Sequence, residues 1–167
     1  PWELWSLMPM KQSVRHVPRL LHLPWGYDPE YTPLTDPIAG YTIEHLKVLD
    51  LRPIDFSLRG TINDYRARLQ QRFEKTSGRV RSVFGPCQSR QEWGKELTKT
   101  CVTLCDHDED FLSGRIVDAM AAGCLVLSKP SPSMDMLAPG GYIPIQSGKD
   151  KWPDEEIVFA QTEKFLE

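Results

Sequence analysis

The stretch Cys101-Val102-Thr103-Leu104-Cys105 is apolar throughout apart from one hydroxyl side chain. Such a run is typical of a strand that is covered on both faces, as in a parallel sheet. A helical pattern follows over residues 111–122 and ends at Gly123, and the apolar residues 124–127 predict the next strand. This strand–helix–strand order indicates a βαβ unit.

The same alternation extends from this unit in both directions. Further strands are expected at 54–58, 80–84 and 142–145, and further helices at 63–75, 90–98 and 154–166. The last strand contains Pro144 and should therefore lie at an edge. Asn63 or Asp64 can cap the first of these helices, and Ser89 with Glu92 can form a reciprocal capping pair for the second. The pattern predicts an α/β fold, a Rossmann-like doubly wound parallel sheet that binds ligands at the carboxyl ends of its strands.

Residues 1–50 have a different character. Six prolines, at positions 9, 18, 24, 29, 33 and 37, interrupt every candidate helix before position 40. We expect residues 16–28 to form a short strand followed by a connector rich in Pro, Gly and Asp, and residues 41–49 to form a short helix. The chain is thus divided into an irregular N-terminal segment and linker, 1–50, and one ligand-binding domain, 51–167.

Composition narrows the class of protein. The 167 residues include 20 basic and 23 acidic side chains, and 40% are apolar, as in an ordinary globular domain. No apolar run approaches the roughly 20 residues of a membrane span, and the first residues lack a signal-peptide pattern. We therefore expect a cytoplasmic protein, or a Golgi-lumenal one if the full-length protein carries a membrane anchor. The four cysteines form no Cys-x-x-Cys pair, so they predict no zinc site.

Four acids lie within the loop Asp106-His107-Asp108-Glu109-Asp110, directly after the buried strand. Like charges at this spacing repel and call for a neutralising partner. The carboxylates could hold a hydroxyl-rich ligand, or a divalent cation through the Asp-x-Asp arrangement. The third interpretation is a solvated acidic loop that favours the N-terminus of the next helix.

Ser113, Gly114 and Arg115 come next, in the first turn of the helix that ends at Gly123. A helix N-terminus attracts phosphate, Gly114 permits close approach, and Arg115 could bind phosphate with two donors. The alternative for Arg115 is an ordinary surface side chain. Asp118, one turn further on, could bind a ribose diol or pair with Arg115.

The segment from Arg52 to Arg90 is basic, with eight arginines and Lys75 against three acids. Arg59 precedes Gly60 in the turn after the first strand, where it could meet an anion. The arginines of the following helix should in part form a solvated face. Nucleic acid is an alternative ligand, but the sequence pI of about 5.8 and the absence of interleaved aromatics favour a compact anion such as a nucleoside diphosphate.

Residues 110–128 resemble the donor-site signature of GT-B glycosyltransferases, an acid followed after a short gap by Glu-Ala-Met-Ala-x-Gly-x-Pro-Val-Val. The matching stretch is Asp110-Phe111-Leu112-Ser113-Gly114-Arg115-Ile116-Val117-Asp118-Ala119-Met120-Ala121-Ala122-Gly123-Cys124-Leu125-Val126-Leu127-Ser128. The variant is most similar to exostosin-like and spore-maturation-type enzymes. Two further segments resemble the linker into the C-terminal lobe and its first strand: Leu23-Pro24-Trp25-Gly26-Tyr27-Asp28-Pro29-Glu30 and Phe56-Ser57-Leu58-Arg59-Gly60.

The resemblance implies a single GT-B lobe that binds a nucleotide-diphosphate sugar. By position, Asp110 and Arg115 would be catalytic. The donor would be bound by Arg59, Gly60, Phe84, Gly85, Asp108, Ser113, Gly114, Arg115 and Asp118. GT-B enzymes need no metal, so the resemblance implies no cofactor and no metal ligand. Where retaining members have glutamates this chain has Asp110 and Asp118, and the stereochemistry stays open.

The implied reaction transfers the sugar to a glycan or another hydroxyl acceptor, with the general base in an N-terminal acceptor lobe of the same or another chain. This lobe alone would then be inactive. Two alternatives remain open: a non-catalytic nucleotide-binding module of GT-B descent, and a domain that binds nucleic acid or another polyanion.

Overall fold

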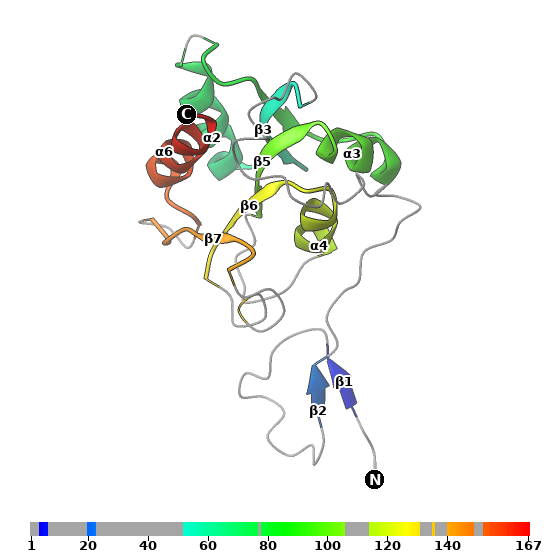
Figure 1. The fold of residues 1–167 in the computed structure, drawn as a ribbon. Helices are drawn as coiled ribbons and strands as arrows, with labels where there is room; N and C mark the ends of the chain where they lie inside the picture. Colours follow the sequence, from blue (N-terminus) through cyan, green and yellow to red (C-terminus); the bar gives the residue numbers. More distant parts are fainter. Residues whose placement is uncertain are drawn as a thin grey trace.

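The computed structural model describes residues 4–6, 20–22, 52–76, 78–105, 114–130, 135, 140–148 and 152–167. Its described core is a five-stranded, all-parallel sheet in the order β4-β3-β5-β6-β7 (Figure 1). The strands are β3 Ile54–Arg59, β4 Ser82–Gly85, β5 Thr100–Cys105, β6 Leu125–Ser128 and β7 Ile143–Pro144. The expected α/β, Rossmann-like doubly wound fold is confirmed, and β7 with its proline lies at an edge.

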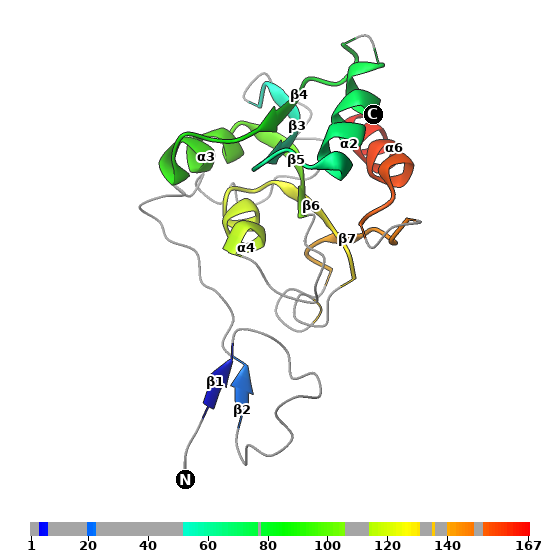
Figure 2. The same cartoon turned by 180° about the vertical axis from the view of Figure 1, so that it is seen from behind.

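Within the described residues, two helices cover each face of the sheet. Helices α2 and α6 lie side by side on one face, and α3 and α4 on the other (Figures 1 and 2). Their bounds are α2 Asp64–Glu74, α3 Arg90–Leu97, α4 Gly114–Ala121 and α6 Glu155–Leu166. The chain leaves β3 for β4 on one side and then crosses to β5 on the other, so the strand order reverses between β3 and β5. Doubly wound sheets bind ligands at the carboxyl end of such a switch point.

All six side chains of β5 are buried, as the apolar run predicts. On the α2 and α6 face the core is aromatic: the Phe56 and Phe73 rings stack at 4.3 Å between centroids, and Phe159 meets Phe73 edge-on at 5.1 Å. All four cysteines are free; Cys101, Cys105 and Cys124 are buried. The buried central strand thus lies between the two helical layers, and these rings pack α2 and α6 onto the sheet.

The helix ends follow the capping residues. The Asn63 side chain accepts from the N–H of Arg66 at 2.9 Å, and Ser89 Oγ accepts from the N–H of Glu92 at 3.0 Å. The expected return bond differs, because Glu92 Oε2 accepts from the N–H of Gln88 at 2.8 Å, one residue earlier than in a capping box. Both bonds still supply orphan N–H groups at the start of α3 with acceptors.

Helix α4 ends at Gly123 as predicted, in a Schellman motif. Gly123 has φ 74°, the N–H of Cys124 donates to the carbonyl of Ala119 at 2.9 Å, and the N–H of Gly123 donates to that of Met120 at 3.0 Å. The predicted first residues of this helix, 111–113, lie outside the described residues. The tight corner sends the chain directly into β6.

Arg52, before β3, is a buried arginine whose guanidinium is bound by backbone carbonyls. Its Nη1 donates to the carbonyl of Thr100 at 2.5 Å, and its Nη2 to that of Ala122 at 2.6 Å. The carbonyls of a helix C-terminus carry partial negative charge, which favours a cation there. Arg52 thereby joins the start of β5 to the end of α4.

The N-terminal region contributes two short strands, β1 Leu4–Ser6 and β2 Leu20–His22, which pair in parallel. Strand β2 lies within residues 16–28, where a short strand followed by a connector is expected, and the helix expected at 41–49 lies outside the described residues. None of the helices in the described part of the chain is long and apolar enough to cross a bilayer.

Replacing Arg52 should destabilise the fold. Arg52→Met leaves two buried carbonyls without their donor, which should lower the free energy of unfolding by about 2–4 kcal/mol. Urea unfolding measures this, with Arg79→Met as the matched control because Arg79 is exposed. Equal midpoints for the two variants would contradict the role given to Arg52.

Alkaline pH should also lower the free energy of unfolding, through the buried thiol of Cys124. Burial raises the pKa of the Cys124 thiol from 9.0 to about 12, so between these pH values only the unfolded chain loses this proton. The thiol therefore lowers the free energy of unfolding by about 1.4 kcal/mol per pH unit above pH 9 and has no such effect below it. Urea unfolding of Cys124→Ala should show a correspondingly shallower decline above pH 9; an unchanged slope would refute this.

Candidate functional site

The first turn of α4 lies at the carboxyl end of β3, at the switch point of the sheet. Arg115 Nη1 donates to the carbonyl of Arg59 at 3.0 Å, although 56 positions separate the two residues. The N–H of Gly60 donates to the carbonyl of Gly85 at 3.0 Å, which joins the ends of β3 and β4. The structure thus brings together Arg59, Gly60, Gly85 and Arg115, four of the residues that the sequence selects.

Gly60 lies next to the guanidinium groups of two arginines, Arg66 and Arg115. Its φ of 134° is one that side-chain-bearing residues rarely adopt. A methyl group at this position would lie 2.3 Å from Arg66 Nη1 and 3.3 Å from Arg115 Nη1. The two Nη1 atoms therefore lie within about 6 Å of each other, where unit charges repel by roughly 1–3 kcal/mol at dielectric constants of about 80 to 20. The turn thus brings two guanidinium groups together at the switch point.

The Arg59 side chain does not lie where a residue that binds an anion is expected, because it is paired with Glu96. Its Nε lies 2.9 Å from both carboxylate oxygens of Glu96, and its Nη2 is also paired with Glu96. Its Nη1 donates to the carbonyls of Phe84 at 3.1 Å and Pro86 at 3.4 Å. The hydrogen bond to Glu96 raises the pKa of Arg59. The side chain thus connects β3, α3 and the loop after β4, and its charge is already matched.

Asp118 lies on the α3-facing side of α4 and is 1% exposed. Its Oδ2 accepts from Arg90 Nη2 at 3.2 Å, whereas the sequence offers Arg115 or a ribose as its partner. The difference arises because Arg115 reaches to β3 while α3 packs against α4 and presents Arg90. A buried carboxylate, bound to Arg90 of α3, thus follows the first turn of α4.

The remaining predicted residues are placed only in part. The Phe84 ring packs in the aromatic core, 5.7 Å from Phe56 and 5.8 Å from Phe73 between centroids, so its carbonyl and not its ring faces Arg59. Gly114 is the first residue of α4. Asp108, Asp110 and Ser113 lie outside the described residues, as does the whole acidic loop. Among the residues that are described, no group of three His, Cys, Asp or Glu side chains could hold a metal ion.

Most of the other arginines of the basic segment are paired within the fold. Arg68 Nε lies 2.7 Å from Glu155 Oε1, and Arg72 Nε lies 2.9 Å from Glu156 Oε2, so two ion pairs connect α2 to α6. Arg81 is likewise paired with Asp55 at 3.1 Å. These pairs, which cross from α2 to α6 and from loop to strand, leave no continuous basic row along α2.

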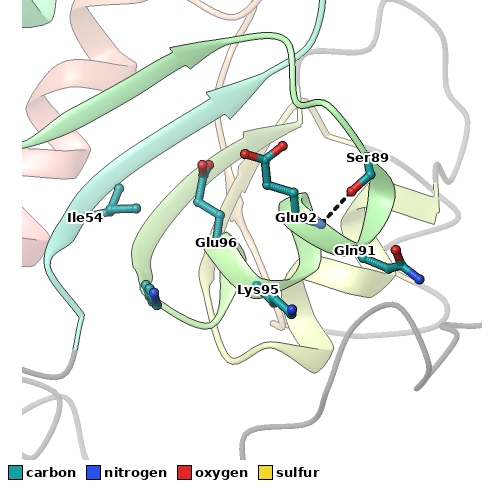
Figure 3. Close-up of a pocket in the computed structure, with 7 residues that line it drawn as sticks. Ile54, Ser89, Gln91, Glu92, Lys95 and Glu96 are labelled. Atoms are coloured by element: carbon teal, nitrogen blue, oxygen red, sulfur yellow. Dashed lines mark hydrogen bonds between the residues drawn. The ribbon is translucent and has the colours of Figure 1, made fainter.

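Two of the cavities formed by described residues lie along α3 and between α2 and α6. One, of about 460 Å³, runs along α3 and is shown in Figure 3, where Glu92 and Glu96 point toward the strands. Its lining residues are Ile54, Ser89, Gln91, Glu92, Lys95, Glu96 and Lys99. The other, of about 350 Å³, lies between α2 and the start of α6 around Tyr65 and Trp152. Their linings mix both signs of charge and do not include Arg115 or Asp118.

Sequence reasoning missed three residues of this region: Arg66, Arg90 and Glu96. Nothing in the local pattern distinguishes Arg66 from Arg68 and Arg72 on the same helix. The pairing of Glu96 with Arg59 spans 37 positions and depends on how α3 returns along the sheet. Only its position one turn before the central strand could have drawn attention to Glu96.

Comparison with models of protein families, with curated proteins and with solved structures found no match for this chain. The function is therefore argued from the geometry of the site and from the residues that form it.

Breaking the Arg59–Glu96 pair should loosen the carboxyl end of the sheet. The two side chains are 19% and 10% exposed, so Glu96→Gln should lower the free energy of unfolding by about 1–3 kcal/mol. A double-mutant cycle with Arg59→Gln measures the coupling by urea unfolding. If the two effects simply add, the pair does not stabilise the turn.

Proposed function

We propose that this chain is the donor-binding half of a glycosyltransferase of the GT-B type, which transfers a sugar from a nucleotide-diphosphate sugar to a hydroxyl acceptor. The observation that carries the proposal is the position of Gly114 and Arg115 at the carboxyl end of β3, where doubly wound sheets bind ligands. The resemblance of residues 110–128 to a donor-site signature supports the same assignment.

The charge of this region suits a diphosphate. The N–H groups at the start of α4 and its positive dipole end favour a phosphate, and the exposed Arg115 side chain can supply charged donors. Because Gly60 has no side chain, the Arg115 guanidinium can lie close to the backbone of this turn. These groups would neutralise the diphosphate without a metal ion.

The other donor contacts are proposed by position. Asp118 would bind the ribose, although its carboxylate is buried and paired with Arg90, so that Arg90 would hold it in place. Asp108, Ser113 and Gly114 would complete the donor site. Asp110 would lie near the sugar. Gly85 would contribute through its backbone beside Gly60.

The proposed reaction is a displacement at the sugar C1 in which the nucleoside diphosphate leaves. Arg115 and the start of α4 would stabilise the negative charge that develops on the leaving group. An acceptor hydroxyl needs a general base in an inverting reaction, and that base would come from an acceptor lobe. We therefore expect this lobe to bind the donor but not to turn it over alone.

Calorimetric titration with UDP, GDP and their sugar conjugates tests the proposal. Arg115→Ala should weaken binding about tenfold to a hundredfold, since a charge-assisted hydrogen bond contributes about 1.5–3 kcal/mol. Arg79→Ala, which removes an exposed arginine elsewhere, should leave the affinity unchanged.

Failure of every nucleotide to bind at millimolar concentration, or an Arg115→Ala variant that binds like the wild type, would overturn the proposal. Turnover by a longer chain that includes an acceptor lobe distinguishes a transferase from a nucleotide-binding module that has lost the chemistry.

A further inference from the structure

We infer that the cavity between the starts of α2 and α6, named here the α2–α6 cavity, binds one neutral sugar ring. Its volume is about 350 Å³, and its lining includes Tyr65, Trp152 and Asp154. Cavities of about 300–1,000 Å³ are the usual size of small-ligand sites. That the sugar belongs to the acceptor glycan rests on the proposed function, whereas the sugar site itself follows from the residues of the cavity.

The α2–α6 cavity lies at the end of the sheet where parallel strands bind ligands. Tyr65 and Arg68 belong to the first two turns of α2, which follows β3, and the other lining residues, from Gly148 to Glu155, follow β7. Ligands of doubly wound sheets bind outside the carboxyl ends of the strands. The cavity therefore shares this end of the sheet with Arg115 but lies on the face that α2 and α6 cover (Figures 1 and 2).

Two aromatic side chains line the cavity as one flat wall. The rings of Tyr65 and Trp152 stack with 5.4 Å between centroids and 13° between planes. The face of an aromatic ring carries partial negative charge, which attracts the weakly positive C–H bonds that gather on one side of a sugar ring. A stacked pair presents a flat surface to such a ring, whereas rings that enclose a ligand would stand at steep angles to one another.

The wall is held in place by the backbone on either side of Trp152. The N–H of Gly148 donates to the carbonyl of Trp152 at 2.9 Å, and the N–H of Asp154 donates to that of Gln146 at 3.1 Å. A methyl group on Gly148 would lie 3.3 Å from Asp154 Oδ2, so a residue without a side chain suits this close approach. A wall that is ordered before the ligand arrives lowers the entropic cost of binding.

Asp154 supplies an acceptor for a sugar hydroxyl. Its Oδ1 caps α6 by accepting from the N–H of Glu156 at 3.0 Å and of Ile157 at 3.2 Å. Within the described part of the chain, the other carboxylate oxygen, Oδ2, accepts no hydrogen bond. An ionised carboxylate only accepts hydrogen bonds, so Oδ2 selects a ligand that donates, as a hydroxyl group does.

The charges around the cavity favour a neutral ligand. The Arg68 guanidinium already lies over the Tyr65 ring, 6.0 Å from its centroid, and a cationic ligand would be repelled by it. An anion is disfavoured because the described lining holds two carboxylates, Asp154 and Glu155, against this one arginine, whose Nε is 2.7 Å from Glu155 Oε1. A flat wall, a hydroxyl acceptor and no net positive charge together describe a site for a sugar ring.

Saturation-transfer NMR and titration of the full chain with the methyl glycosides of glucose, galactose, mannose and xylose test the sugar site. Trp152→Leu should weaken binding of the tightest glycoside about tenfold, because leucine stays apolar but has no flat ring. Asp154→Asn should weaken it about threefold to tenfold, since asparagine still caps α6 but replaces one acceptor oxygen by N–H donors.

Trp93→Leu is the matched control, because it removes a tryptophan from α3 on the other face of the sheet and should leave the affinity unchanged. Thermal unfolding shows which variants are folded, and Asp154→Asn, which keeps the cap, tests the site even if Trp152→Leu does not fold.

The outcomes separate the sugar site from the proposed function. A wild-type chain that binds no glycoside at high millimolar concentration, or a folded Asp154→Asn variant that binds as the wild type does, overturns the sugar site and leaves the nucleotide proposal to its own titration. Binding of tetramethylammonium without binding of any glycoside also overturns it. Glycoside binding that needs Asp154, in a chain that binds neither UDP nor GDP, supports the sugar site and overturns the proposed function.

Discussion

The buried guanidinium of Arg52 is the contact on which the placement of α4 depends. It binds the carbonyls of Thr100 and Ala122, and so fixes the end of α4 against the start of β5. Helix α4 has only eight residues and spans about 12 Å, so fixing one end limits where the other can lie. At that other end Arg115 reaches the carbonyl of Arg59. The candidate site lies at the carboxyl ends of the strands, and its position thus depends on contacts at their amino ends.

Charged side chains hold the elements together at the carboxyl ends of the strands. Arg59 and Arg90 are matched to Glu96 and Asp118, and these pairs connect the elements around the site. The guanidinium groups of Arg66 and Arg115 meet over Gly60, a residue without a side chain. Matched pairs give rigidity at little net charge. The formal net charge of −3 does not reveal this arrangement.

The secondary structure of the domain could be predicted from sequence because each element carries a local signal. The buried run at 101–105, the caps at Asn63 and Ser89, and the helix end at Gly123 all appear in the structure. The roles of Arg59 and Asp118 could not be predicted, because their partners lie 37 and 28 positions away and are chosen by helix packing. The acidic loop around Asp108 and Asp110 remains a prediction, as it lies outside the described residues.

The pairing of α2 with α6 has a consequence for how the protein is made. Helix α2 follows directly after β3, the first strand of the sheet. The ring of Phe73 on this helix is nevertheless covered by Phe159 of α6, which lies 86 residues later in the chain. Domains fold as units during synthesis, and this core stays open until residues 155–166 have left the ribosome. The aromatic core on this face of the sheet is therefore completed only when almost the whole domain has been translated.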